Sequence, residues 1–373
     1  MNLVLQFFKD KSIISAILIL FTMEILLQFG CYKPFLKKSS YAQTVNYITD
    51  TSVSSLKTLK PNVLIIGTSI AYEGISLELL NEELKSNGIV VQSVAVPGSE
   101  LIVQDLAIKK ILSSENRIHT IIHINDLLFP WVDRVVLMDS TLSMIGELGR
   151  KDAINDIAND EYRTTWEDYS FLFLKFVAYR RDIGDFILYP NKRIKDIGKE
   201  FKKNKKIFYA YDNSYEESMS SYKISSLDDC IKKTIAGSLI PEGSNHYHMD
   251  AIYRTCSLAI GSKLTFDKNQ FTELYGKRLS NLYKYIRSKN IKIINIYPPV
   301  PSLLDNNQYS KRIKFWEKEY TNILSESRYD LSDSIPFENN TNYYYDMVHL
   351  NKKGKEVFTK YLAEKLKQVT FSN

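Results

Sequence analysis

The sequence has few of the residues on which several classes of protein depend. Only three of its 373 residues are cysteines, and their spacing fits no metal-binding pattern. The net charge of +6 is mild for this length and no nucleic-acid-binding motif is present, so DNA and RNA are not expected partners. Hydrophobic residues make up 44% of the chain, which is enough for a full core in one large domain or two ordinary ones.

The three cysteines leave alternatives open. Cys230 and Cys256 could form a disulfide if the body of the protein lies in an oxidising compartment, but two free buried thiols fit the sequence as well. Cys31 stands at the end of an apolar segment, as a lipoprotein cysteine would, although residues 28–30 before it match a lipidation signal poorly. The cysteines alone do not fix the compartment.

The chain has one long apolar run, Ile13–Tyr32, which Glu24 and Gln28 interrupt. Its 20 residues are about enough to cross a bilayer core of roughly 30 Å. No small-x-small cleavage site lies close behind it, so we expect an uncleaved signal anchor, residues 1–36, rather than a removed signal peptide. Glu24 keeps a second interpretation open, a helix buried in the globular part.

The orientation of this anchor does not follow from charge. Lysines flank the run on both sides: Lys9 and Lys11 before it, and Lys33, Lys37 and Lys38 after it. A short N-terminal tail usually stays inside, and long domains cross largely regardless of flanking charge. We therefore expect a single-pass membrane protein with a periplasmic or otherwise extracytoplasmic body.

After a polar stretch that we expect to be a linker, residues 37–60, apolar strands alternate with helical patterns. The expected strands are Val63–Ile66, Ile89–Val96, Thr120–Ile124, Ile291–Tyr297 and Arg328–Leu331. The expected helices are one capped by Ser76 and ended by Asn87-Gly88, Leu101–Leu112, Phe271–Ser288, Trp316–Leu324, and a last one capped by Asn351. This alternation predicts an α/β domain, residues 61–373, whose mainly parallel sheet is covered by helices on both faces.

The pattern breaks between the third and fourth strands. Residues 131–267 are irregular, aromatic and polar, with no detectable repeat, and we expect an inserted cap region there, with a helix within 168–176. A basic run, Lys192–Lys206, holds eight Lys or Arg residues. Such a run is commonly a solvated helix face, and contact with anionic headgroups or an acidic polymer is the alternative. Aromatic residues such as Tyr162, Trp166 and Tyr169 could stack on sugars or belong to a core.

Residues that could take part in catalysis lie near both ends of the α/β pattern. Ser69 follows the first strand in a turn, and Asp346 and His349 precede the last helix. In a nucleophilic triad the serine attacks, the histidine takes its proton, and the aspartate orients the histidine and stabilises its charged form. Each residue also has a structural alternative, because Ser69 or Asp346 could simply cap a helix. A triad requires Ser69 Oγ and His349 Nε2 to lie within ~4 Å.

These motifs resemble those of the SGNH/GDSL hydrolase superfamily. Gly67-Thr68-Ser69 matches the first block, with Thr68 where an acidic residue is usual, and Asp346-Met347-Val348-His349 matches the last. Gly98 is similar to the glycine of the second block. The third block, Gly-x-Asn-Asp, is similar to His123-Ile124-Asn125-Asp126, in which His123 replaces the glycine. The resemblance covers about residues 60–130 and 285–370.

The resemblance implies a flavodoxin-like three-layer sandwich with a large insertion after the third strand. It implies a serine-dependent ester hydrolase or O-acyltransferase with Ser69, His349 and Asp346 as its triad, and it requires no cofactor or metal. The backbone N–H groups of Ser69 and Gly98 and the Asn125 amide would form the oxyanion hole. The anchor and the insertion are similar to envelope members, such as alginate O-acetyltransferases and D-alanine transfer proteins of teichoic acid synthesis. A cell-envelope glycan or lipid ester is therefore the expected substrate.

Two other functions fit the same residues. The chain could be a non-catalytic envelope protein that keeps the fold and binds or assembles glycans. It could also be the periplasmic partner of a membrane acyl-donor protein, with the basic run as its docking surface. His246, His248 and Asp250 form a His-x-His-x-Asp cluster that could hold a metal, although the expected reaction needs none. His119 and His123 are expected to be structural.

Overall fold

The computed structural model divides the chain into two compact units. The first contains Met1–Asp50 and Val135–Lys205, and the second contains Thr51–Arg134 and Lys206–Asn373. The residues that the structure describes are 10–37, 40–113, 117–126, 166–200, 218–222, 224–240, 242, 249–253, 255–256, 267–299, 308–324, 341–346 and 348–368.

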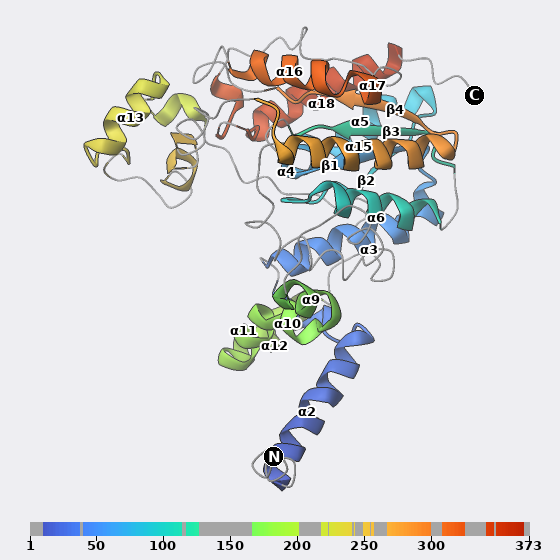
Figure 1. Ribbon diagram of the computed structural model, residues 1–373, viewed down its shortest axis with the longest axis vertical. Coiled ribbons are helices and arrows are strands. Elements are labelled where there is room, and N and C mark those ends of the chain that lie inside the picture. The colour runs from blue at the N-terminus through green and yellow to red at the C-terminus, as the bar shows by residue number, and fades with distance from the viewer. Residues whose placement is uncertain are drawn as a thin grey trace. The chain divides into compact units, whose positions relative to one another are not determined.

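The second unit is built on a parallel sheet. Its described strands are β1 (Val63–Gly67), β2 (Val91–Ser93), β3 (Thr120–Ile124) and β4 (Lys292–Ile296), and their order is β2-β1-β3-β4 (Figure 1). Every residue of β1 and β3 is buried, as expected of apolar strands with layers on both faces. The sequence therefore predicted the α/β class and the parallel sheet correctly.

Helices cover both faces of this sheet. On one face, α6 (Leu101–Leu112) joins β2 to β3 and packs against α15 (Gln270–Ser288), which precedes β4. On the other face, α5 (Leu77–Leu84) packs against the last helix, α18 (Lys352–Gln368) (Figure 1). The expected caps are present: Ser76 Oγ accepts from the N–H of Leu79, and Asn351 Oδ1 accepts from the N–H of Gly354.

The strand order reverses next to β1. From β1 the chain passes to β2 on one side and then returns to β3 on the other, so the carboxyl ends of β1 and β3 flank a topological switch point. Ligands of open α/β sheets bind at such points. Ser69 follows β1 at this place.

The second expected strand is shorter than predicted. β2 covers only Val91–Ser93, yet the N–H groups of Val94 and Val96 still donate to Ile65 O and Gly67 O. The chain thus stays beside β1 up to the turn at Pro97-Gly98. The strand expected at Arg328–Leu331 lies outside the described residues.

The stretch expected as a linker, residues 37–60, contains a helix instead. This helix, α3 (Tyr41–Leu59), buries Ser52 and Ser55 within the second unit. The Ser52 hydroxyl donates to Ser93 O at 2.8 Å, and Ser55 Oγ accepts from Gln92 Nε2 at 2.6 Å. The polar residues that suggested a linker therefore bond directly to β2.

In the first unit, the apolar run forms helix α2 (Lys11–Gln28), with a mean hydropathy of 1.7. By length and composition this helix can cross a membrane. The side chains of Ile17, Leu18, Ile19, Leu20 and Phe21 are 46–63% exposed, so this part of α2 is not a core helix of its unit.

The C-terminal end of α2 binds part of the expected cap region. This part comprises α9 (Trp166–Phe173), α10 (Lys175–Ala178), α11 (Arg180–Leu188) and α12 (Pro190–Glu200). The Glu24 carboxylate accepts from the N–H groups of Lys175 and Phe176, each at 2.8 Å, and Gln28 Nε2 donates to Phe173 O. Residues 166–200 therefore belong to the same compact unit as α2, whereas residues 218–256 belong to the unit of the sheet.

The cysteine alternatives are also decided. Cys230, in helix α13 (Leu227–Ile235), forms a disulfide with Cys256, and both sulfurs are buried in the second unit. Cys31 is a free, exposed thiol.

Candidate active site

The nucleophile candidate, Ser69, is placed by a tight turn after β1. Gly67 allows this turn, because its φ is +152° and a Cβ there would lie 2.9 Å from Ile124 O. Thr68 caps the following helix α4 (Ser69–Gly74) by accepting from the N–H of Ile70. The cap is therefore Thr68 rather than Ser69, and Ser69 opens the first turn of α4.

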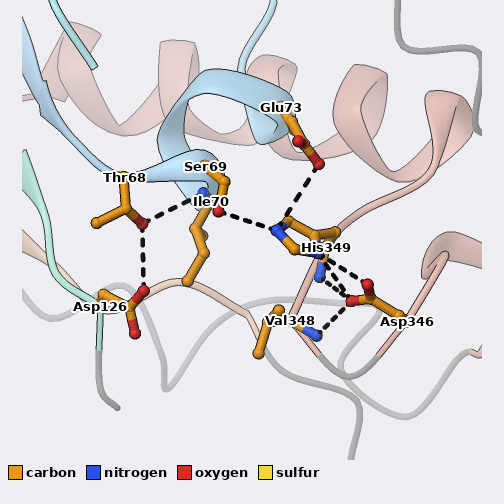
Figure 2. A network of polar contacts seen from close by, with 8 residues as sticks. All are labelled: Thr68, Ser69, Ile70, Glu73, Asp126, Asp346, Val348 and His349. Carbon is orange, nitrogen blue, oxygen red and sulfur yellow. Dashed lines mark hydrogen bonds and ion pairs between the residues drawn. The ribbon is translucent and has the colours of Figure 1, made fainter. Parts of the chain in front are cut away.

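Ser69, His349 and Asp346 lie together, as Figure 2 shows. His349 Nε2 is 3.0 Å from Ser69 Oγ, within the distance that a triad requires. The other ring nitrogen, Nδ1, is 2.9 Å from Asp346 Oδ2. A chain of hydrogen bonds thus joins two ends of the sequence that are 280 positions apart.

Asp346 is completely buried, and its carboxylate is held by three donors. Oδ1 accepts from the N–H groups of Val348 at 2.9 Å and His349 at 2.8 Å, and the imidazole is the third donor. Burial by itself raises the pKa of Asp346, but the charge of His349 and these hydrogen bonds outweigh it and leave the pKa below its usual value. The carboxylate is therefore ionised at neutral pH, as the orienting member of a triad must be.

The loop that carries Asp346 and His349 is fixed at both ends. Tyr344 and Leu350 form an antiparallel bridge, and the N–H of Tyr345 donates to His349 O at 2.9 Å. Asn351 then caps α18, so Asp346 is not needed as a cap. The buried Tyr222 adds a hydrogen bond from its hydroxyl to Tyr345 O.

A fourth residue, Glu73, was not predicted. It lies on α4 one helical turn after Ser69, and its Oε2 is 3.7 Å from His349 Nε2 (Figure 2). Both side chains are only 11% exposed. The spacing of four residues puts Ser69 and Glu73 on one face of α4, but the sequence does not show that this face meets His349.

Thr68 links the ends of two neighbouring strands. Its hydroxyl donates to Asp126 Oδ2 at 3.2 Å while accepting from the N–H of Ile70 (Figure 2). Asp126, expected from the third motif, therefore lies at the edge of the site.

The expected oxyanion residues have different surroundings. Gly98 has a left-handed φ of +66°, and the next residue, Ser99, ties its turn to β1 by donating to Gly67 O at 3.0 Å. Asn125 is fully buried, and its Nδ2 donates to Asn295 Oδ1 on β4 at 2.7 Å. Among the contacts of the described residues, none joins Asn125 to Ser69, so its role in an oxyanion hole stays a prediction.

Asn125 belongs to a buried polar chain. Asn295 Oδ1 also accepts from the hydroxyl of Tyr283 on α15, whose oxygen lies 2.9 Å from His123 Nδ1. Burial lowers the pKa of His123 to about 3, so this ring is neutral and serves packing and hydrogen bonding. His119, whose Nδ1 is 2.9 Å from Thr120 Oγ1, is likewise engaged locally.

No metal centre appears among the residues that the structure describes, which contain no suitable group of three or more His, Cys, Asp or Glu side chains. His246 and His248 of the expected cluster lie outside those residues, as does Tyr162. Trp166 is 91% exposed, and Tyr169 stacks on Phe173 within α9.

No protein-family model matches this chain, and no curated protein matches it either.

Proposed function

We propose that this protein is a serine-dependent ester hydrolase or O-acyltransferase of the SGNH/GDSL type. The observation that carries the proposal is the hydrogen-bonded series from Asp346 through His349 to Ser69. Each contact has the partner and the distance that nucleophilic catalysis needs. The strand order β2-β1-β3-β4 with all strands parallel supports a flavodoxin-like sandwich, in which Ser69 stands at the switch point.

In the proposed reaction, Ser69 Oγ attacks the ester carbonyl carbon and its proton passes to His349 Nε2. The imidazolium that forms is stabilised by Asp346, whose carboxylate is ionised. His349 then gives the proton to the departing alcohol oxygen, which leaves Ser69 acylated. Water or a sugar hydroxyl, deprotonated by His349, then attacks the acyl carbon. The bond between the acyl carbon and Ser69 Oγ breaks, and His349 returns the proton to Ser69 Oγ.

The developing oxyanion requires donors near Ser69. The N–H of Ser69 is the first of α4, and the first N–H groups of a helix have no intrahelical acceptor. We expect this group to act together with the N–H of Gly98 and the amide of Asn125. Each oxyanion donor is typically worth ~3 kcal/mol of the barrier.

We place the substrate in the cell envelope. The N-terminal helix can anchor the chain in a membrane, and the disulfide Cys230–Cys256 favours an oxidising compartment for the body. An extracytoplasmic enzyme at a membrane meets ester-bearing glycans and lipids. Hydrolysis and acyl transfer use the same triad and differ only in the acceptor.

The test is labelling of the intact protein with a fluorophosphonate, which reacts with activated serines. The wild type should be labelled, Ser69→Ala should not, and Ser113→Ala, which changes an exposed serine after α6, should label like the wild type. Equal labelling of Ser69→Ala and the wild type would exclude Ser69 as the nucleophile. Absence of labelling in all three, with glycan binding retained, would favour the non-catalytic glycan-binding alternative. Acyl release from a small activated ester, assayed beside transfer to envelope polysaccharide, then separates hydrolase from transferase.

A further inference from the structure

Helices α11 and α12 are tied to the few residues that directly follow α2. The backbone N–H of Lys37 donates to Asp182 Oδ1 at 2.7 Å, and Lys37 Nζ pairs with Asp185 at 3.1 Å. Arg193 on α12 donates from its guanidinium to Phe35 O and also pairs with Asp185. These contacts therefore keep α11 and α12 close to the C-terminal end of α2.

Further contacts hold the same end of α2 to α9 and α10. Besides the bonds from Lys175 and Phe176 to Glu24, the buried hydroxyls of Tyr32 and Tyr179 lie 3.0 Å apart. The four helices gather at the C-terminal end of α2, and its N-terminal end projects away from them (Figure 1). They are thus placed around one end of an apolar helix.

The surface of α11 and α12 is amphipathic. Large apolar side chains are exposed where the two helices meet and on α12: Ile187 by 68%, Leu188 by 72%, Tyr189 by 58% and Ile194 by 59%. Lys192 and Lys195 are exposed among them. Ile and Leu beside Tyr and Lys are typical of helices that lie in the boundary between headgroups and acyl chains.

The position of α11 and α12 at the end of α2 and their exposed apolar side chains have one explanation if α2 crosses a bilayer. Its C-terminal end then emerges at the membrane surface, and the contacts of Phe35 and Lys37 hold α11 and α12 at that depth. Apolar side chains that would be unfavourable in water are buried there in lipid. The lysines complement anionic headgroups.

We propose that α11 and α12 form an interfacial collar around the end of α2. Ile187, Leu188 and Ile194 insert into the leaflet from which α2 emerges, and Lys192 and Lys195 contact the phosphate groups of anionic lipids. The collar fixes the height and tilt of the first unit on the membrane. This inference depends on α2 spanning the bilayer and not on any catalytic activity.

The test is spin labelling of the full chain in a Cys31→Ser background, which removes the free thiol; Cys230 and Cys256 do not react with the label because they form a disulfide. The protein is reconstituted in vesicles of phosphatidylcholine and phosphatidylglycerol, and collisions of each label with oxygen and with a water-soluble nickel chelate are compared. The labelled variants are Leu188→Cys in the collar, Leu18→Cys in α2, and Ile235→Cys, an 82% exposed apolar position of the second unit, as the matched control.

We expect the oxygen-to-nickel ratio at positions 18 and 188 to exceed that at position 235 several-fold. A ratio at 188 equal to that at 235, with position 18 in lipid, would overturn the collar while leaving the anchor intact. A low ratio at position 18 would show that α2 does not lie in lipid, and this would overturn the collar as well. Ile187→Cys repeats the measurement at a neighbouring exposed position and guards against a local disturbance at 188.

Discussion

Glu73 Oε2 lies 3.7 Å from His349 Nε2, the same nitrogen that faces Ser69 Oγ at 3.0 Å. The imidazole therefore has a carboxylate beside each of its nitrogens, Asp346 at Nδ1 and Glu73 near Nε2. A negative charge at this distance favours the protonated ring. In the proposed mechanism, Glu73 is a positioning residue that stabilises the imidazolium without contacting the substrate.

Replacing Glu73 by Gln should therefore move the acidic limb of the pH–rate profile. Without the carboxylate the imidazolium is less stable, so the ring stays neutral, and able to accept the proton of Ser69, down to lower pH. We expect the acidic limb of kcat/KM to move to lower pH. Glu78→Gln, an exposed glutamate at the start of α5, is the control and should leave the profile unchanged. An unchanged limb in Glu73→Gln would show that the contact does not affect the ring.

Replacing Asp346 by Asn should lock His349 in the wrong tautomer. The amide oxygen of Asn would take the place of Oδ1, which accepts from the N–H groups of Val348 and His349. The amide NH2 would then face Nδ1, so the ring proton would sit on Nε2, and Ser69 would lose its proton acceptor. We expect kcat to fall by roughly 10³–10⁴-fold.

The tautomer itself can be observed by ¹⁵N NMR of the imidazole. In the wild type the proton should be on Nδ1 and in Asp346→Asn on Nε2. Asp105→Asn, which affects an ion pair on α6, is the control and should change neither the tautomer nor kcat. A wild-type tautomer in an inactive Asp346→Asn would assign the loss to another cause.

Asp346 should also contribute to stability in acid. Its pKa in the folded state is below the ordinary value of 3.8, so its contribution is fully present above pH 3.8. The contribution is lost as the pH falls through the lower, folded-state value. Urea unfolding of the wild type and Asp346→Asn over about pH 2–6 measures this. The decline in unfolding free energy below pH 3.8 should be smaller in the variant, and identical slopes would contradict the assignment.

Gly67→Ala should destabilise the second unit and distort the site. The added Cβ would meet Ile124 O and Ala71 Cβ, each at 2.9 Å, and the φ of +152° adds backbone strain. We expect a loss of roughly 1–3 kcal/mol in the free energy of unfolding. Gly88→Ala is the control, because Gly88 has a left-handed φ of +66° and open space around it, and only the strain term applies. Equal losses in the two variants would show that the contact with β3 is not tight.

Glu24→Leu should loosen α10 although it makes α2 more apolar. The carboxylate bonds to two backbone N–H groups at the start of α10, and loss of such a cap typically costs ~1 kcal/mol. We expect faster proteolysis within residues 166–200 of the full chain in vesicles. Ile25→Leu, an exposed neighbour, is the control. Unchanged proteolysis in Glu24→Leu would mean that the bonds do not hold the helices.

The sequence predicts best those strands and helices that each consist of one buried apolar run. The strand Thr120–Ile124 and the helix Leu101–Leu112 have the predicted bounds, because consecutive or periodic apolar residues in the sequence indicate which positions are buried. α3 was missed, since two of its buried positions are serines whose hydroxyls bond to β2. Nothing in local sequence distinguishes such a serine from one in a linker.

The candidate site shows the same limit. Ser69, Asp346 and His349 could be identified because their types and order resemble a known motif, and the fold brings them together. Glu73 could not be identified, since which carboxylate faces the imidazole depends on how α4 meets the last loop. Glu24 was recognisable as unusual in an apolar helix, but its partners, Lys175 and Phe176, are 151 and 152 residues away.

The 280 positions between Ser69 and His349 have a consequence for the order of events during synthesis. During synthesis α2 leaves the ribosome before Ser69, and His349 follows Ser69 only after 280 further positions. Under the proposed mechanism, a partly made or C-terminally clipped chain carries a serine with no base beside it and cannot attack envelope esters. In that mechanism, activity would begin only when Tyr344 pairs with Leu350 and α18 packs against α5, because these contacts bring His349 to Ser69.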